Sequence, residues 1–132
     1  MASRYDSWCS INLGSVENVA GNVSTISCKE GYLIKQGGRV KNWKKRWFVV
    51  QNDHMAYYEN KDSTKPQKVW DLKTLLNVKE CACENKRNTF CLMFVDRTMF
   101  CVADTPIKME EWISFFQGKI DDFKKQILLD SY

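Results

Sequence analysis

The chain has 132 residues, which fits one domain with a real core and is too short for two independent ones. Its composition, 44% hydrophobic and 27% charged residues, is ordinary for a globular protein, and no apolar run approaches the ~18 residues that suggest a membrane-spanning helix. The first ten residues lack the basic stretch and apolar run of a secretory signal, and Ala2 excludes the myristoylation pattern, so we expect a cytoplasmic protein.

The first part of the chain differs in character from the rest. Residues 1–28 are rich in Ser, Asn, Gly and Val, carry little charge and show no sustained hydrophobic period. They are predicted to form an N-terminal extension that packs loosely or stays flexible. Residues 29–132 are predicted to form the folded domain.

Short runs of β-favouring residues, separated by turn signals, follow from Lys29 onward. Gly37-Gly38, Asn52-Asp53, Lys65-Pro66 and Asp96-Arg97 are among the breaks between them. The pattern predicts seven strands, over residues 31–35, 43–51, 55–59, 68–72, 76–81, 89–95 and 98–103.

The last segment has helical periodicity and is predicted to be an amphipathic helix over 105–128. Its apolar face repeats at three- and four-residue spacing through Trp112, Phe115, Phe116, Lys119, Ile120 and Phe123. Asp104 or Thr105 is expected to cap it, with Pro106 at the first helical position, where a proline loses no hydrogen bond. Because open sheet edges need cover, we expect a mainly β fold in which the seven strands form either two packed sheets or a partly open barrel, with this helix covering one end.

The six cysteines are interpreted as reduced thiols rather than as a disulfide framework, because no secretory signal is visible. Cys81, Cys83, Cys91 and Cys101 lie in apolar, strand-like runs, where a free cysteine behaves as a small hydrophobic residue. Cys81-x-Cys83 lacks a second ligand pair at zinc spacing, and the only histidine, His54, is far away in sequence. We therefore expect neither a metal site nor a cofactor.

The net charge of +4 is less informative than its distribution. The segment 35–46 contains six basic residues and no acidic one: Lys35, Arg39, Lys41, Lys44, Lys45 and Arg46. Such a concentration favours a localised anion site over a uniformly basic surface.

Strand alternation predicts where these cations point. Lys44 and Arg46 share a face with the apolar Phe48 and Val50, so they continue the interior face toward the mouth of the barrel. Lys35 is in line with buried Leu33 in the same way. A solvated charged edge is the alternative, but it would gain nothing from cations placed on the apolar face.

The loop between the first two predicted strands is expected to complete the anion site. It adds Arg39 and Lys41, and Gly37-Gly38 would let backbone N–H groups approach an anion closely. On the third strand, the hydroxyl of Tyr58 is expected to donate to a phosphate beside Arg46.

Three motifs in the chain resemble the pleckstrin homology (PH) domain family. They are Glu30-Gly31-Tyr32-Leu33-Ile34-Lys35, Trp43-Lys44-Lys45-Arg46-Trp47-Phe48-Val49-Val50, and the helix that carries Glu110-Glu111-Trp112. The resemblance covers about residues 29–124, and it implies two orthogonal antiparallel sheets closed by a C-terminal helix.

Within that family, the members that bind 3-phosphorylated inositol lipids have a lysine on the first strand, a short basic loop and a Lys-x-Arg-hydrophobic motif on the second. Lys35, Lys44, Arg46 and Trp47 match this pattern. The loop looks like that of the cytohesins and certain adaptor proteins. Arg97-Thr98-Met99-Phe100 looks more like protein kinase B, which implies that Arg97 is a second-tier phosphate contact. Lys73 falls where that kinase has a polar contact residue.

The sequence therefore predicts a phosphoinositide-binding module that recruits its parent protein to the plasma membrane through phosphatidylinositol 3,4,5-trisphosphate or 3,4-bisphosphate. Expected partners are the headgroup, the anionic membrane surface and other domains of a larger signalling protein. The alternative is a protein-interaction domain that binds a peptide or partner protein and has only weak, non-selective lipid affinity.

Two further classes of function are disfavoured. Nucleic-acid binding would need aromatic side chains interleaved with cations on an open surface, whereas most aromatic residues here have core positions. Catalysis has no visible apparatus, because the chain has one histidine, no phosphate-loop glycine pattern and no nucleophile beside a base.

Overall fold

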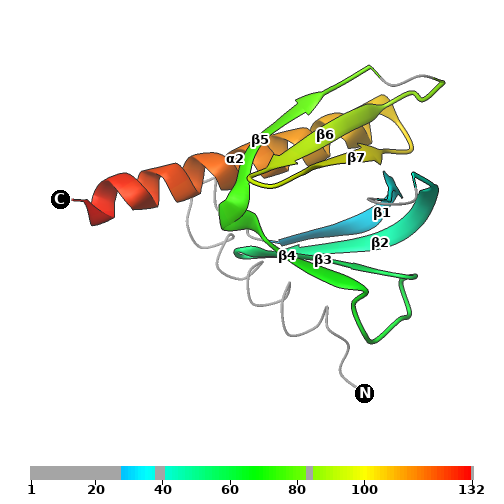
Figure 1. The fold of residues 1–132 in the computed structure, drawn as a ribbon, viewed down its shortest axis with the longest axis horizontal. Helices are drawn as coiled ribbons and strands as arrows, with labels where there is room; N and C mark the ends of the chain where they lie inside the picture. The colour runs from blue at the N-terminus through cyan, green and yellow to red at the C-terminus, as the bar shows by residue number, and fades with distance from the viewer. Residues whose placement is uncertain (1–27, 38–40, 83–84, 132) are drawn as a thin grey trace.

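The computed structural model describes residues 28–37, 41–82 and 85–131. The predicted extension over residues 1–28 therefore lies outside the described residues, apart from Cys28. In chain order the elements are β1 (Cys28–Gln36), β2 (Trp43–Gln51), β3 (His54–Tyr58), β4 (Lys68–Asp71), the 3-10 helix η2 (Leu72–Thr74), β5 (Leu75–Glu80), β6 (Thr89–Phe94), β7 (Thr98–Val102) and α2 (Pro106–Asp130) (Figure 1). The predicted mainly β class is confirmed.

The strands form one antiparallel sheet in the order β4-β3-β2-β1-β7-β6-β5. β1 pairs with β2 along its whole length, but it pairs with β7 only at Ile34↔Val102 and Lys35↔Cys101. This short junction lets the sheet fold over, so that β1 to β4 form one layer and β5 to β7 the other (Figure 1). The end of β1 that carries Lys35 thus lies where the two layers meet.

The link between the layers differs from the sequence prediction. The predicted strand over 68–72 ends at Asp71, because the chain there turns into η2. The side chain of Asp71 caps that turn, accepting a hydrogen bond of 2.9 Å from the backbone N–H of Lys73. This turn takes the chain from β4 in one layer to β5 in the other.

α2 begins as the sequence predicts and ends two residues later, at Asp130. Thr105 is the N-cap: its hydroxyl oxygen accepts a hydrogen bond of 3.1 Å from the N–H of Lys108, and Pro106 is the first helical residue. The buried side of the helix, which includes Trp112 and Phe116, packs against β5, β6 and η2. The helix thus covers the β5–β7 layer and runs on beyond it (Figure 1).

The core lies between the two layers and under α2. Phe48, Phe90 and Phe116 are completely buried, and the Trp112 ring stacks on Phe116 with 5.6 Å between the ring centroids. Cys91 and Cys101 are buried free thiols, as expected of small apolar residues, whereas Cys83 lies outside the described residues. Burial raises the pKa of the Cys101 thiol, so this side chain stays neutral.

One buried lysine joins the helix to the sheet. The ammonium of Lys119 donates a hydrogen bond of 2.6 Å to the backbone carbonyl of Asn52, in the turn between β2 and β3. Burial lowers the pKa of Lys119. Among the described residues, no helix is long and apolar enough to cross a membrane, and no cluster of three or more potential metal ligands occurs.

Candidate anion-binding site

A basic pocket lies at the mouth between the two layers. Its volume is about 290 Å³, and it is lined by Lys35, Gly37, Asn42, Lys44, Arg46, Tyr57 and Gln67. None of these described lining residues is acidic. The side chains around it therefore offer a positive field and hydrogen-bond donors.

The register of β1 and β2 explains why the cations meet there. Lys35 pairs with Lys44, and Leu33 pairs with Arg46 two positions along. Phe48, on the same face of β2 as Lys44 and Arg46, is in the core. The two basic residues therefore continue the core face of β2 to the rim of the barrel.

Lys35 lies at the centre of this positive charge. Its ammonium is 4.5 Å from the centroid of the Tyr57 ring, so one side of the cation faces an aromatic surface. Burial, and then the charge of Arg46, lowers the pKa of Lys35 from its ordinary value of 10.5, with smaller contributions from Lys44 and Arg97. An anion placed among these groups would offset their mutual repulsion.

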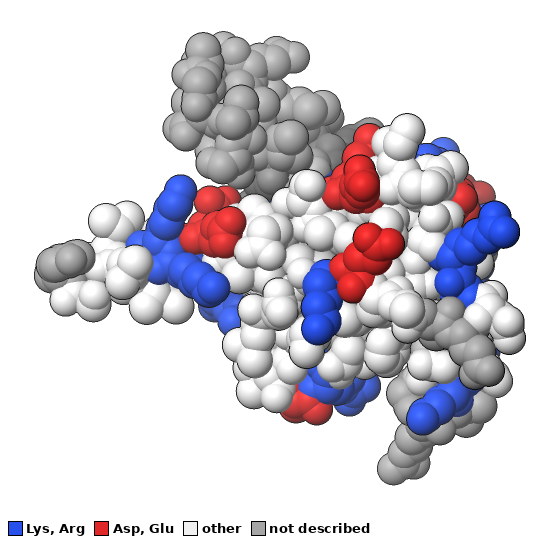
Figure 2. All heavy atoms as spheres, turned by 90° about the horizontal axis from the view of Figure 1, so that it is seen from above, with Lys and Arg blue, Asp and Glu red and all other residues white. Residues whose placement is uncertain are grey.

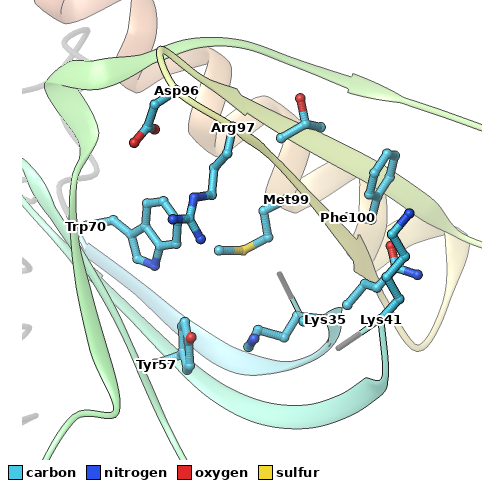
Figure 3. A pocket seen from close by; sticks show the side chains of 11 residues that line it. Lys35, Lys41, Tyr57, Trp70, Asp96, Arg97, Met99 and Phe100 are labelled. Carbon is cyan, nitrogen blue, oxygen red and sulfur yellow. The ribbon is translucent and has the colours of Figure 1, made fainter. Parts of the chain in front are cut away.

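A second, larger pocket adjoins the first and shares Lys35, Gly37 and Tyr57 with it. This aromatic pocket has a volume of about 460 Å³ and is lined in addition by Gln36, Lys41, Trp70, Asp96, Arg97, Thr98, Met99 and Phe100. Figure 3 shows Arg97 and Trp70 on one side of it, with Lys35 and Lys41 on the other. Strands from both layers therefore build this pocket.

The charge distribution elsewhere is different. On the face drawn in Figure 2, acidic and basic side chains lie interspersed over the surface. This face is therefore not uniformly basic, in agreement with the localised positive charge that the sequence predicts.

Five of the predicted site residues line the two pockets: Lys35, Lys41, Lys44, Arg46 and Arg97. Arg39 lies outside the described residues. Lys73 lines neither described pocket; its ammonium is 3.7 Å from the carboxylate of Asp53, in the turn between β2 and β3. The expectation that Lys73 joins the other cations therefore disagrees with this geometry, because η2 places its side chain beside that turn.

Tyr58 is not placed beside Arg46 as expected, because it is on the opposite face of the sheet. It packs with Val49 and Ala56, outside the main core cluster. Tyr57 lines both pockets instead. The two-residue turn between β2 and β3 could have predicted this from the sequence. It pairs Gln51 with His54, and three positions further along the two strands Phe48 pairs with Tyr57, so Tyr57 shares the face of the core residue Phe48.

The loop glycines also differ from expectation. The N–H of Gly37 donates a hydrogen bond of 2.9 Å to the carbonyl of Asn42, which closes the base of the loop. This N–H is therefore already used, and Gly38 lies outside the described residues. In the described part of the site, side chains supply the donors for an anion.

Comparison with known proteins identifies the family. The model of the PH domain matches residues 28–121, which span all seven strands and the first part of α2. The chain belongs to the PH domain family.

Two curated relatives of this chain are an adapter and a kinase homolog. The chain is 36% identical over 115 residues to a dual adapter for phosphotyrosine and 3-phosphotyrosine and 3-phosphoinositide from Mus musculus, covering 86% of this chain and 41% of the adapter. It is 35% identical over 92 residues to a RAC family serine/threonine-protein kinase homolog from Dictyostelium discoideum, covering 69% of this chain and 21% of the kinase. The chain thus spans well under half the length of either relative.

Among solved structures, the C-terminal PH domain of pleckstrin in complex with D-myo-Ins(1,2,3,4,5)P5 is similar to this domain. The TM-score is 0.60 at 33% sequence identity, and the match covers 67% of this chain and 93% of the pleckstrin domain. That PH domain holds a polyphosphorylated inositol.

Proposed function

We propose that this PH domain binds the headgroup of a 3-phosphorylated inositol lipid, phosphatidylinositol 3,4,5-trisphosphate or 3,4-bisphosphate, and so recruits its parent protein to the inner leaflet of the plasma membrane. One observation carries the proposal. Lys35, Lys44 and Arg46, from two paired strands, line a single pocket with no acidic residue among its described lining. The role is one of binding, without catalysis.

The three cations have distinct chemical roles in this proposal. Lys35 and Lys44 act as point charges for phosphate oxygens, whereas the planar guanidinium of Arg46 grips one phosphate through two parallel hydrogen bonds. Arg46 already donates one hydrogen bond of 2.9 Å, to the carbonyl of Lys45, which helps to fix the guanidinium. Since β1 and β2 are paired along their whole length, the spacing of the cations is fixed and selects for adjacent phosphates rather than for charge alone.

The relatives support this choice of ligand. The mouse adapter has a 3-phosphoinositide in its name, and it matches 86% of this chain. The pleckstrin domain shows a PH fold with a bound inositol pentakisphosphate.

A liposome sedimentation panel tests the proposal, with vesicles that each carry one phosphoinositide in a neutral lipid. Binding is expected to the 3,4,5-trisphosphate and the 3,4-bisphosphate, and to be much weaker with the 4,5-bisphosphate. Equal binding to every phosphoinositide, or to vesicles with phosphatidylserine alone, would contradict the proposed selectivity.

Salt is expected to weaken liposome binding while the order of lipid preference persists. Cations near an anionic leaflet contribute about 1 kcal/mol each, and this attraction is screened beyond a Debye length of about 8 Å at physiological salt. The measurement is the same sedimentation assay, repeated over a series of sodium chloride concentrations. Binding that strengthens with salt would indicate that hydrophobic insertion is the main force.

The two neighbouring tyrosines of β3 give a matched test of the site. Tyr57→Phe is expected to weaken binding of soluble inositol 1,3,4,5-tetrakisphosphate by about fivefold. The substitution removes the hydroxyl that would donate a hydrogen bond to the headgroup, and one such bond contributes about 1 kcal/mol. Tyr58→Phe is expected to leave the affinity unchanged, because Tyr58 packs on the opposite face of the sheet. Isothermal titration of both variants measures the two affinities. Weaker binding in Tyr58→Phe with unchanged binding in Tyr57→Phe would mean that the headgroup binds on the opposite face of the sheet.

A further inference from the structure

Trp70 lines the aromatic pocket, and two cations lie against its ring. It is on the inner face of β4, is only 9% exposed, and stacks on Phe94 with 4.7 Å between the ring centroids. The guanidinium carbon of Arg97 lies 5.0 Å from the centroid of the Trp70 ring, and the ammonium of Lys68 lies 4.6 Å from it. Figure 3 shows the Arg97 side chain reaching down from its turn past the indole.

Burying the indole N–H of Trp70 costs free energy that a purely apolar core residue would not lose. The Nε1 atom of Trp70 is buried and has no hydrogen-bond partner among the residues that the structure describes. An unpaired buried donor loses its hydrogen bonds to water, a penalty that an apolar ring such as phenylalanine would avoid. The ring face offers a reason for tryptophan, since the indole face attracts a cation more strongly than the ring of any other aromatic side chain.

The Trp70 ring is a contact that can fix the position of Arg97. Within the described part of the chain, the guanidinium takes part in none of the ion pairs and donates none of the side-chain hydrogen bonds. Asp96 precedes it and lines the same pocket, but no ion pair joins the two side chains. A guanidinium stacked on an aromatic face keeps its N–H donors available along its edge.

We propose that Trp70 is a positioning residue that holds the Arg97 guanidinium in the aromatic pocket, ready to bind a phosphate of the headgroup whose other phosphates contact Lys35, Lys44 and Arg46. This inference rests on the proposed function. The two pockets adjoin at Lys35 and Tyr57, so one polyphosphorylated ring can reach both. Trp70 then affects affinity through Arg97 and without contact to the ligand.

A double-mutant cycle tests the coupling, with soluble inositol 1,3,4,5-tetrakisphosphate as the probe and isothermal titration as the measurement. Arg97→Ala is expected to weaken binding by about tenfold or more, because it removes a charged hydrogen bond to a phosphate. Trp70→Leu is expected to weaken binding by about threefold to tenfold, the range of one partly desolvated cation–π contact. In the Arg97→Ala background, Trp70→Leu is expected to cause no further loss. Trp70→Phe, which keeps a weaker aromatic face, is expected to retain intermediate affinity.

Thermal denaturation separates positioning from packing. Trp70→Leu is expected to lower the melting temperature in both backgrounds, and by slightly more in the wild type, which also loses the contact between Trp70 and Arg97. In the Arg97→Ala background the packing loss therefore occurs without a loss of affinity. Affinity losses that simply add up in the double variant, or an Arg97→Ala variant with wild-type affinity, would overturn the inference. If Trp70→Leu does not fold, Trp70→Phe in both backgrounds provides the same cycle with a smaller effect.

The control variant Arg46→Ala distinguishes failure of this inference from failure of the proposed function. Loss of binding in Arg46→Ala, together with wild-type affinity in the Trp70 and Arg97 variants, would overturn only the role of Trp70. Wild-type affinity in Arg46→Ala would contradict the proposed headgroup site itself.

Discussion

Replacing Trp112 by alanine is expected to lower the free energy of unfolding by about 3 to 5 kcal/mol, a large share of the ~5 to 15 kcal/mol that stabilises a typical domain. The Trp112 side chain is 3% exposed and stacks on Phe116. It also lies against the backbone of β1, where a Cβ atom built on Gly31 would be 3.4 Å from the indole. Truncation therefore leaves a cavity between the helix and the sheet.

Chemical denaturation followed by circular dichroism measures this effect. Leu128→Ala is the matched control, because Leu128 is on the same helix but is 61% exposed, and its truncation is expected to change stability little. An unchanged denaturation midpoint in Trp112→Ala would show that α2 does not seal the core.

Arg46→Ala is expected to have the opposite profile, with lost binding and preserved stability. Hydrogen bonds to charged groups contribute about 1.5 to 3 kcal/mol each, so losing a bidentate grip on a phosphate should weaken headgroup binding by about 100-fold or more. The melting temperature should stay near that of the wild type or rise slightly, because Arg46 is the strongest of the neighbouring charges that lower the pKa of Lys35. Arg46→Lys should also bind weakly, since it keeps the charge without the planar fork.

Lys45→Ala is the control for net charge. Lys45 precedes Arg46 on β2, but its ammonium lies 4.6 Å from the ring centroid of Tyr32, and it lines neither pocket. Both substitutions remove one positive charge from the same strand. Titration of inositol 1,3,4,5-tetrakisphosphate should show a small loss for Lys45→Ala, and equal losses in the two variants would mean that bulk electrostatics, and not the pocket, drives binding.

Local chemistry in the sequence was enough to predict most of the fold. Helical spacing and a Thr-Pro start give α2 to within two residues at either end, because capping and packing there depend on near neighbours. Alternation along β2 correctly places Lys44 and Arg46 at the pocket, since a strand has only two faces and Phe48 marks the inner one.

The errors arose where placement depends on register or on the path of the chain between layers. Tyr57 and Tyr58 are adjacent and chemically identical, so only the pairing across the β2–β3 turn decides which one faces the pocket. Lys73 was misplaced because η2 turns the chain beside Asp53. The contact between Trp70 and Arg97 joins the two layers of the sheet. Strand alternation could not predict it, because alternation says which face a side chain is on but not which residue of the other layer it meets.

The most direct test of the central claim is a calorimetric comparison of two soluble headgroups on the wild-type domain. Inositol 1,3,4,5-tetrakisphosphate, the headgroup of the 3,4,5-trisphosphate lipid, is compared with inositol 1,4,5-trisphosphate, the headgroup of the 4,5-bisphosphate lipid. If Lys35, Lys44 and Arg46 fix a 3-phosphorylated ring, the tetrakisphosphate binds at least about tenfold more tightly, a difference of about 1.4 kcal/mol. Equal affinity for the two headgroups, or tighter binding of the trisphosphate, would contradict the proposed site.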